Sequence, residues 1–562
     1  MKRNGKRALG LVGVFLFLGT SLFASSNEKG IEYYRAELYG AAKVFFLGQK
    51  NQPVTEQAEN CYYLGQTYYQ LNQLDSALYY YQKAVEVDPE YPFGYIGEGK
   101  LELKKGNLKV ADELFKKAGG LTKKDPSVYG AIAEAYADLG INDGVKPALD
   151  KARKANKKYA GAFMVEGDVL IKQGKVGEAI LRYENALLLD AKDKLAYLKI
   201  ARVYKDVNPP EALNYLDRLL AIDADYIPAY ALIGDINRDL GAYKKALDAY
   251  EKFISIPGVP LLQQERYAQL LYFTNQYEKS LAQIKVVLAQ EPDNNIMHRF
   301  EAYNNYKLEN TALGIQQIEF FLQNTEKERH IYSDYLYYGN MLLAAKLPKK
   351  AIESYEKAAE LDSNKPEINK ALAEAAYAAA LYLESMKYYE KYFEEGGDTP
   401  VASDYYYYGN VCYQYTKEIA LRPQNSPLTP EDLAQESVEF HTFLEKGDKA
   451  FSEVLSRIPT SHLGYLWKAN LYSLEDLYDQ TRTGTVRGVA KPYFDAAIEF
   501  MQNNNENGVR NKDLISSYRY LLSYYSSIDN SEALVEYSKK ILQLDPNDEL
   551  AKQTLDILKV KY

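Results

Sequence analysis

The chain has 562 residues, of which 47% are hydrophobic and 26% are charged, and its formal net charge is −9 at pH 7. This length exceeds what one compact core can bury, so it predicts about three or four domains or an extended architecture. The composition excludes both a disordered chain and a bundle of membrane spans. Because the chain is acidic and lacks a basic stripe, we expect no nucleic-acid partner.

The N-terminal segment has the pattern of a secretory signal. Lys2, Arg3, Lys6 and Arg7 precede the apolar run ALGLVGVFLFLGTSLFA, residues 8–24, and polar residues follow it. Basic, apolar and small-residue regions in this order are typical of exported proteins. The run is short for a membrane span, which favours cleavage after residue 24. We therefore expect an exported chain with no transmembrane span after cleavage; the alternative is an uncleaved segment that tethers the chain to the inner membrane.

A pair of small residues then recurs along the chain at a fixed spacing. In five places a glycine is followed twelve residues later by an alanine: Gly65 and Ala77, Gly99 and Ala111, Gly167 and Ala179, Gly234 and Ala246, Gly339 and Ala351. Four residues after each alanine stands a large aromatic residue: Tyr81, Phe115, Tyr183, Tyr250 and Tyr355. Small residues allow two helix backbones to approach closely, and the aromatic ring fills the groove beside them. The pattern predicts packed helical hairpins with a period of about 34 residues.

The stretch YYLGQTYYQLNQLDSALYYYQKAVEVDP, residues 62–89, resembles the tetratricopeptide repeat. Nearly the full signature of that family is present: Leu64, Gly65, Tyr68, Ala77, Tyr81, Ala84 and Pro89. Weaker units continue in phase from KGIEYYRAELYGAAKVFFLG, residues 29–48, to the C-terminal end. The resemblance implies an all-α fold, a right-handed α-solenoid of about fourteen helix-turn-helix repeats.

Two insertions, within residues 416–446 and 479–491, interrupt the rhythm near the C-terminal end. In the first, Thr429 is the expected N-cap and Pro430 the first residue of a long helix that ends at about Ile458. The second, DQTRTGTVRGVAKPYF, residues 479–494, is expected to be a loop that carries Arg482, Arg487 and Lys491. Each insertion is either a functional loop or a tolerated excursion at a repeat turn.

The predicted organisation has four parts. A signal peptide covers residues 1–24, and a regular solenoid covers residues 25–415. Repeats with the two insertions cover residues 416–546, and a capping helix covers residues 547–562.

Residues that could carry catalysis or bind a metal are scarce. The stretch GYIGEGKL, residues 94–101, has Leu101 where a phosphate-binding loop needs serine or threonine. The four histidines are scattered without zinc-ligand spacing: His298, His330, His441 and His462. We therefore predict no catalytic residue, no metal and no cofactor. Cys61 and Cys412 are too few for a disulfide framework and are predicted to be buried free thiols.

A candidate partner-binding surface follows from the resemblance. In the tetratricopeptide family the residue after the signature glycine is often an asparagine that binds an extended peptide backbone. The equivalent places and their neighbours on the same surface are Leu336, Asn340, Tyr406, Asn410, Tyr413, Leu466 and Asn470. Family members that clamp a C-terminal carboxylate have a lysine at the places of Leu336, Tyr406 and Leu466 here. The departure implies a less charged, aromatic groove; the alternative is a solvated asparagine beside incidental tyrosines.

The run SDYYYYGNVCYQY, residues 403–415, contributes to both packing and surface in this register. Tyr405 and Tyr408 are expected to face the neighbouring helix, whereas Tyr406 and Tyr413 are expected to line the groove.

These observations favour a non-enzymatic scaffold, exported to the periplasm of a Gram-negative bacterium. Its partner would be a protein or peptide, such as part of an envelope transport or secretion complex. The alternative is a carbohydrate-binding protein whose groove tyrosines stack on sugar rings.

Overall fold

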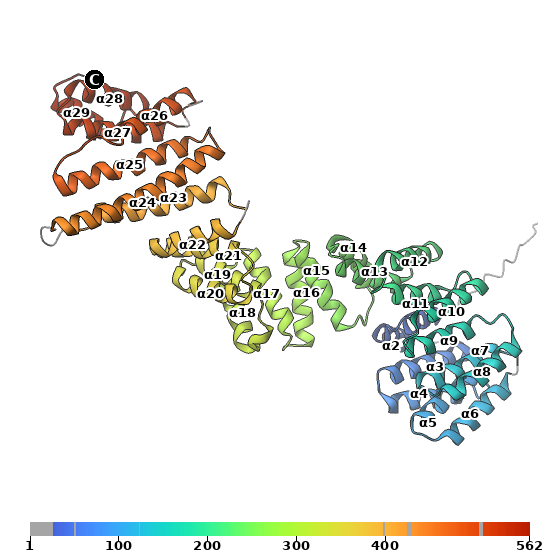
Figure 1. The fold of residues 1–562 in the computed structure, drawn as a ribbon. Coiled ribbons are helices and arrows are strands. Elements are labelled where there is room, and N and C mark those ends of the chain that lie inside the picture. Colours follow the sequence, from blue (N-terminus) through green and yellow to red (C-terminus); the bar gives the residue numbers. More distant parts are fainter. Residues whose placement is uncertain are drawn as a thin grey trace, which may run out of the picture. The chain divides into compact units, whose positions relative to one another are not determined.

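The computed structural model describes residues 26–49, 52–122, 124–396, 399–423, 429–504, 508 and 510–561. Over these ranges it contains 29 α-helices, short 3-10 segments and no strand (Figure 1). The predicted signal segment, residues 1–24, lies outside them. No helix within the same ranges is long and apolar enough to cross a membrane. The predicted all-α fold is confirmed.

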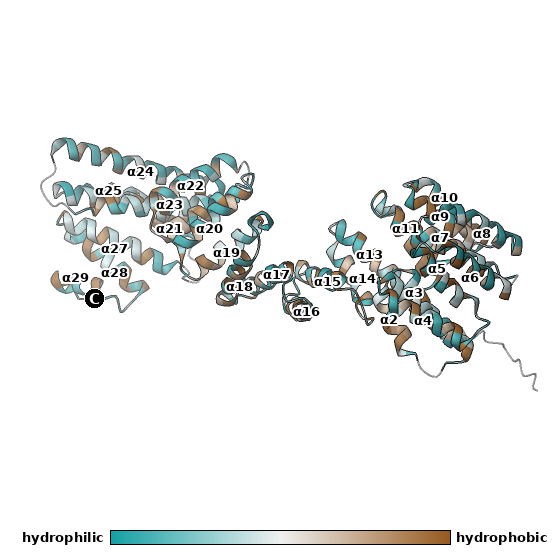
Figure 2. Cartoon of the chain, turned by 90° about the horizontal axis from the view of Figure 1, so that it is seen from below, coloured by the Kyte–Doolittle hydropathy of each residue, from teal (hydrophilic) through white to brown (hydrophobic). Residues whose placement is uncertain are grey.

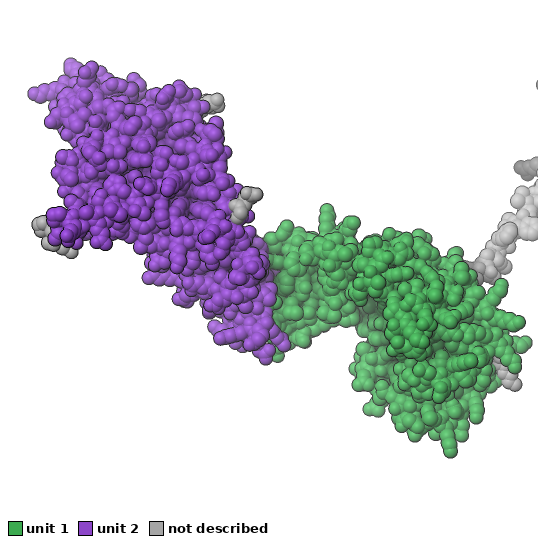
Figure 3. All heavy atoms as spheres, viewed as in Figure 1, with its two compact units in different colours: residues 1–300 green, residues 301–562 purple. Residues whose placement is uncertain are grey.

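The chain forms two compact units, which divide between Phe300 and Glu301 (Figure 3). The first unit contains α1 (Glu28–Arg35), α2 (Tyr39–Gly48), α3 (Val54–Gln70), α4 (Leu74–Val87), α5 (Pro92–Lys104), α6 (Leu108–Leu121), α7 (Pro126–Asp138), α8 (Asn142–Ala155), α9 (Gly161–Lys172), α10 (Val176–Leu189), α11 (Lys194–Tyr204), α12 (Pro209–Ile222), α13 (Ile227–Asp239), α14 (Tyr243–Phe253), α15 (Leu261–Phe273) and α16 (Tyr277–Gln290). Helix α17 (Asn295–Lys307) crosses the division. No sequence feature in the repeat pattern predicts a division at this place.

The second unit continues the succession of hairpins. Its helices are α18 (Thr311–Asn324), α19 (Tyr332–Ala344), α20 (Pro348–Leu361), α21 (Glu367–Ala378), α22 (Tyr382–Glu395), α23 (Ala402–Ala420), α24 (Pro430–Arg457), α25 (His462–Thr483), α26 (Lys491–Asn503), α27 (Asn511–Ser527), α28 (Ser531–Leu544) and α29 (Glu549–Ile557), with the 3-10 helix η1 (Lys327–Arg329). Helices α1 to α28 make fourteen consecutive hairpins, and α29 follows them. Its role as a capping helix stays a prediction. Hydrophobic and hydrophilic residues share the same helices, as amphipathic hairpins require (Figure 2).

The predicted contact between glycine and aromatic ring holds each regular hairpin together. A Cβ atom placed on Gly65 would lie 2.6 Å from the ring of Tyr81, and one on Gly99 would lie 2.5 Å from Phe115. Because real Cβ atoms do not approach other atoms this closely, only glycine lets the ring lie against the helix backbone. The small residue and the ring are therefore one packing unit.

The residue after the glycine has a structural role that the sequence did not predict. The buried hydroxyl of Tyr183 donates to Asp168 (2.7 Å), and that of Tyr250 donates to Asp235 (2.6 Å). In both hairpins the acceptor directly follows the signature glycine. The position therefore satisfies a buried phenol, which would otherwise lose hydrogen bonding on folding.

The first insertion lengthens a hairpin and leaves its packing unit intact. Helix α24 spans 28 residues, and Thr429 caps it in a capping box with Asp432, so the predicted cap and helix are confirmed. A Cβ atom on Gly409 would lie 2.7 Å from the ring of Phe451. Phe451 therefore takes the place of the aromatic residue that follows sixteen residues after the glycine in regular repeats.

The second insertion is more helical than predicted. The sequence predicted a loop over residues 479–494, but α25 continues to Thr483 and α26 begins at Lys491. Gly484, with φ of 75°, ends α25 in the left-handed conformation that favours glycine. The irregular connection is therefore limited to residues 484–490.

Both cysteines are free and buried, as predicted. Burial raises the pKa of the Cys412 thiol to about 12 and also raises the pKa of Cys61. Because the thiolate is the reactive form, we expect neither thiol of the folded protein to react appreciably with Ellman's reagent at about pH 8. In concentrated urea, both thiols of the same protein should react with the reagent, as measured by its absorbance. Rapid reaction of one native thiol would contradict this burial.

Candidate functional site

Helix α1 lies against the inner face of the first unit. The hydroxyl of Tyr34 donates to Oε1 of Gln66 on α3 (3.3 Å), and Glu32 forms an ion pair with Lys194 on α11. Next to α1, the carbonyl oxygen of Ala36 accepts a hydrogen bond from the guanidinium of Arg202 on α11. Helices α3 and α11 belong to the second and sixth hairpins. A helix that contacts both lies inside the curve of the hairpins between them.

Further contacts of this N-terminal hairpin come both from the adjacent hairpin and from distant repeats. The Tyr63 hydroxyl raises the pKa of the Arg35 guanidinium, against the opposing effect of burial, and Glu134 contributes in the same direction. A Cβ atom on Gly40 would overlap the carbonyl oxygen of Gly258, so the two backbones touch here. The chain's own N-terminal hairpin thus occupies part of the inner face that a partner of this unit would use.

In the second unit an aromatic cluster joins helices α23, α24 and α25. The ring of Trp467 on α25 lies 5.3 Å from Tyr413 and 6.1 Å from Tyr406, both on α23, and 6.3 Å from Phe451 on α24, measured between centroids. We call these four residues the Trp467 cluster. Because Tyr406, Tyr413 and Trp467 are each only half-buried, their rings keep an accessible surface.

Two exposed tyrosines, one on α23 and one on α21, extend the aromatic surface around the cluster. Tyr407, whose ring lies 5.6 Å from that of Tyr406, is 52% exposed, and Tyr377 on α21 is 39% exposed. Burial raises the pKa of both Tyr406 and Tyr413, so these hydroxyls stay protonated at neutral pH. Such a surface can bury apolar side chains of a partner and donate hydrogen bonds to its backbone.

The structure distributes the seven predicted residues over three helices. Tyr406 and Tyr413 meet at Trp467, while Leu466 and Asn410 lie buried beneath the surface. The Asn410 amide donates to the carbonyl oxygen of Tyr406 (2.9 Å). Asn470 is half-buried on α25.

The other two predicted residues, Leu336 and Asn340, are half-buried on α19. The Asn340 amide oxygen accepts from Tyr355 (2.8 Å), and its nitrogen donates to Tyr306 (3.1 Å). Both polar atoms of the Asn340 amide are therefore used in hydrogen bonds within the repeats. Its part in partner binding stays a prediction.

Sequence reasoning missed Trp467, Tyr377 and Tyr407. Trp467 is the only tryptophan in the chain and stands two residues before Ala469, which takes the glycine position in its repeat. That signal was present but was not used. Tyr405 and Tyr408 do pack toward the preceding hairpin, as predicted: Tyr405 stacks on Phe393 (4.4 Å) and Tyr408 is buried.

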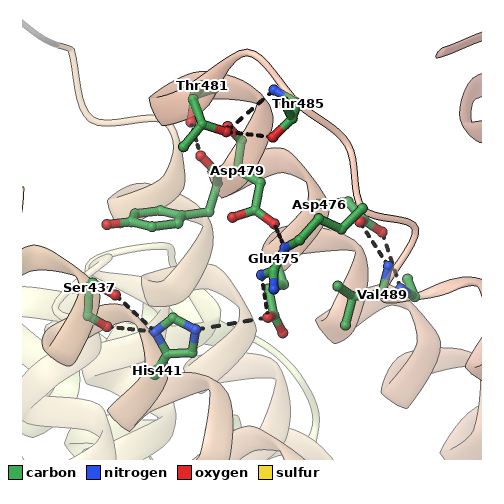
Figure 4. A network of polar contacts seen from close by, with 12 residues as sticks. Ser437, His441, Glu475, Asp476, Asp479, Thr481, Thr485 and Val489 are labelled. Carbon is green, nitrogen blue, oxygen red and sulfur yellow. Dashed lines mark hydrogen bonds and ion pairs between the residues drawn. The ribbon is translucent and has the colours of Figure 1, made fainter. Parts of the chain in front are cut away.

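The basic residues of the second insertion are engaged in internal contacts. Figure 4 shows Glu475, Asp476 and Asp479, the acidic side chains of α25 next to this insertion. Arg487 binds Glu475 (2.9 Å) and Asp479 (2.5 Å), and Asp476 accepts hydrogen bonds from the backbone N–H groups of Val489 and Ala490. Glu475 also lies 3.9 Å from His441 on α24. These contacts hold the connection against α25, so they support a structural role for this insertion.

Within the described ranges, no group of three or more histidine, cysteine, aspartate or glutamate side chains could hold a metal ion. The stretch around Gly99 lies inside helix α5 and so does not form a phosphate-binding loop. Lys100 is buried there, bound to Asp138 (2.5 Å) and Gln66 (3.2 Å).

Comparison with known proteins agrees with this architecture. Residues 58–91, 164–227 and 227–258 match family models of the tetratricopeptide repeat. The Hsp70-Hsp90 organizing protein of Triticum aestivum is 25% identical over 225 residues, which cover 33% of this chain and 39% of that protein. DnaJ homolog subfamily C member 3 of Bos taurus is 24% identical over 287 residues, or 44% of this chain and 56% of that protein. The chain thus spans less than two thirds of these curated relatives.

Among solved structures, the C-terminal part of a TPR repeat-containing protein from Cytophaga hutchinsonii is 22% identical. The match covers 52% of this chain and 99% of that one, with a TM-score of 0.40. Proteins built from such repeats are generally interaction scaffolds that mediate protein–protein contacts. None of the comparisons supports the carbohydrate-binding alternative. The chain therefore carries tetratricopeptide repeats, stacked as an all-α solenoid.

Proposed function

We propose that the protein is a non-catalytic scaffold of the bacterial cell envelope that binds a protein or peptide partner on the aromatic surface around the Trp467 cluster. The observation that carries the proposal is the succession of accessible aromatic rings on α21, α23 and α25. The envelope setting rests on the signal-like residues 1–24. A periplasmic location and a role in a transport or secretion complex belong to the same proposal.

Three further points support protein binding over other functions. Exposed tyrosine and tryptophan rings are the residues that dominate protein interfaces. The inner face of the first unit already contacts the chain's own α1, which leaves less of that face for a partner. The similarity to a protein named for organizing Hsp70 and Hsp90 is also consistent with a scaffold.

Affinity capture with the tagged full chain tests the proposal. Wild type and the double variant Tyr377→Ala/Tyr407→Ala are incubated with envelope extract, and captured proteins are quantified by mass spectrometry. An interface hot spot contributes about 2 kcal/mol or more. We therefore expect the double variant to capture at least about tenfold less of the specific partner than wild type does.

Tyr79→Ala is the matched control, since Tyr79 on α4 is 56% exposed and lies in the other unit. It should capture the partner as wild type does. Equal capture by the double variant and by this control would refute the binding surface. Retention of glycans with no protein partner would refute protein binding itself.

A further inference from the structure

A basic region lies within this acidic chain. Residues 104–158 contain 13 lysine and arginine residues but only 7 aspartate and glutamate residues, whereas the whole chain has a net charge of −9. The region covers the second helices of two successive hairpins, α6 and α8, and helix α7 between them. It lies in the first unit, so it is separate from the Trp467 cluster and does not depend on the function proposed for that cluster.

A hollow of about 1030 Å³ opens between α6 and α8, and α7 forms its floor. The hollow exists because small residues stand where side chains would fill the gap: an added Cβ on Gly120 would meet no atom within 4 Å. Pro147 adds no long side chain on the α8 side. The floor is apolar and aromatic, made by Tyr129, Ile132 and Tyr136 of α7 together with Phe115 of α6.

Four lysines stand around this floor: Lys116, Lys124, Lys151 and Lys154. All four are exposed, and in the part of the chain that the structure describes none of them has a carboxylate within ion-pair distance. Lys100 and Lys199, also in this unit, are by contrast paired with Asp138 and Asp168. Like charges around a concave, partly apolar surface produce a positive potential that attracts anions.

The one acidic side chain of the lining offsets only one of the four lysine charges. Asp112 on α6 accepts a hydrogen bond from the hydroxyl of Tyr136 (2.5 Å), which fixes its carboxylate toward α7. The lysines come from both sides of the hollow, Lys116 on α6 and Lys151 and Lys154 on α8. A ligand in the hollow would therefore be flanked by ammonium groups on two sides and would rest on aromatic rings.

We propose that this hollow binds an acidic peptide segment whose carboxylates pair with the lysines and whose apolar side chains contact the floor. The volume lies at the upper end of the roughly 300–1,000 Å³ of small-molecule sites, so it suits several residues of a chain better than one small anion. Lysine tolerates carboxylates in many orientations, whereas no arginine stands in the lining to grip a phosphate bidentately.

Two other polyanions fit these features less well. A nucleic acid needs a more extensive basic surface than four lysines on a chain of net negative charge. A bilayer surface cannot reach a floor recessed between two helices. Both are therefore outcomes of the test.

Fluorescence anisotropy of the full chain tests the proposal with a fluorescein-labelled peptide of glutamate and aspartate residues with two phenylalanines. Its neutral counterpart has glutamine and asparagine instead. We expect the acidic peptide to bind more weakly as salt increases and the neutral peptide not to bind. Lys151→Glu/Lys154→Glu should raise Kd at least tenfold, and so should Gly120→Trp, which fills the hollow and keeps every lysine.

Lys157→Glu/Lys158→Glu is the matched control, because it makes the same charge change at two exposed lysines outside the lining. It should alter Kd less than threefold. The proposal is overturned if the two double variants weaken binding equally, or if the neutral peptide binds as tightly as the acidic one. It is also overturned if an oligonucleotide or vesicles of anionic phospholipid bind in a manner sensitive to Gly120→Trp while the peptide does not.

Discussion

Tyr250→Ala should lower the free energy of unfolding of the repeats around α14 by about 3–5 kcal/mol. Tyr250 is fully buried, and its ring lies where a Cβ on Gly234 would overlap it. Its hydroxyl donates to Asp235, which also binds Arg266 (2.8 Å). The substitution removes the ring from the packing unit of the hairpin, leaves a cavity between two helix backbones and takes one partner from the half-buried Asp235 carboxylate.

Urea unfolding of the full chain, followed by circular dichroism, measures this effect. We expect the repeats around α14 to unfold at a lower urea concentration than in wild type. Tyr79→Ala is the control, since its 56% exposed ring predicts a change within about 0.5 kcal/mol. Tyr250→Phe keeps the ring and should lose only the hydrogen bond, about 1.5–3 kcal/mol to a charged acceptor. If Tyr250→Ala unfolds at the same urea concentration as Tyr79→Ala, the ring does not hold the hairpin together.

The regular hairpins could be predicted from the sequence because their contacts are local. Gly234, Ala246 and Tyr250 lie within seventeen residues, so one spacing rule describes the whole packing unit. The pairing of Gly409 with Phe451 could not be predicted in this way, because the insertion between them removes the spacing while the packing remains. Periodicity identifies a repeat only where the chain keeps its period.

The candidate sites show a second limit. Tyr406 and Tyr413 were predicted because they occupy repeat positions, but Trp467 joins them only through the stacking of the next hairpin. The contact of Glu32 with Lys194 spans 162 residues, and no local pattern predicts it. The lysine-rich hollow was missed for a different reason: the net charge of the chain averages a basic segment with acidic ones.

Arg482→Met should lower the free energy of unfolding by about 3–5 kcal/mol in the region where the ends of α23 and α25 pack against α24. Arg482 binds Glu436 on α24 (2.7 Å), and the two side chains are only 5% and 7% exposed. Its guanidinium also donates to the carbonyl oxygen of Ile419 at the end of α23 (2.9 Å). Removing the arginine leaves a buried carboxylate whose other cation, Arg422, stays 3.7 Å away on the exposed side.

Fluorescence of Trp467 follows the unfolding of this region directly, because its ring stacks on Phe451 of α24. The matched control is Arg487→Met, since Arg487 lies in the same insertion but is 56% exposed, where an ion pair contributes about 0–1 kcal/mol. The double variant Glu436→Gln/Arg482→Met should recover most of the lost stability, because it removes the uncompensated charge. Recovery would show that Arg482 and Glu436 are coupled and that the loss comes from the unpaired buried carboxylate. Equal unfolding of the two single variants would show that the pair contributes no more than a surface contact.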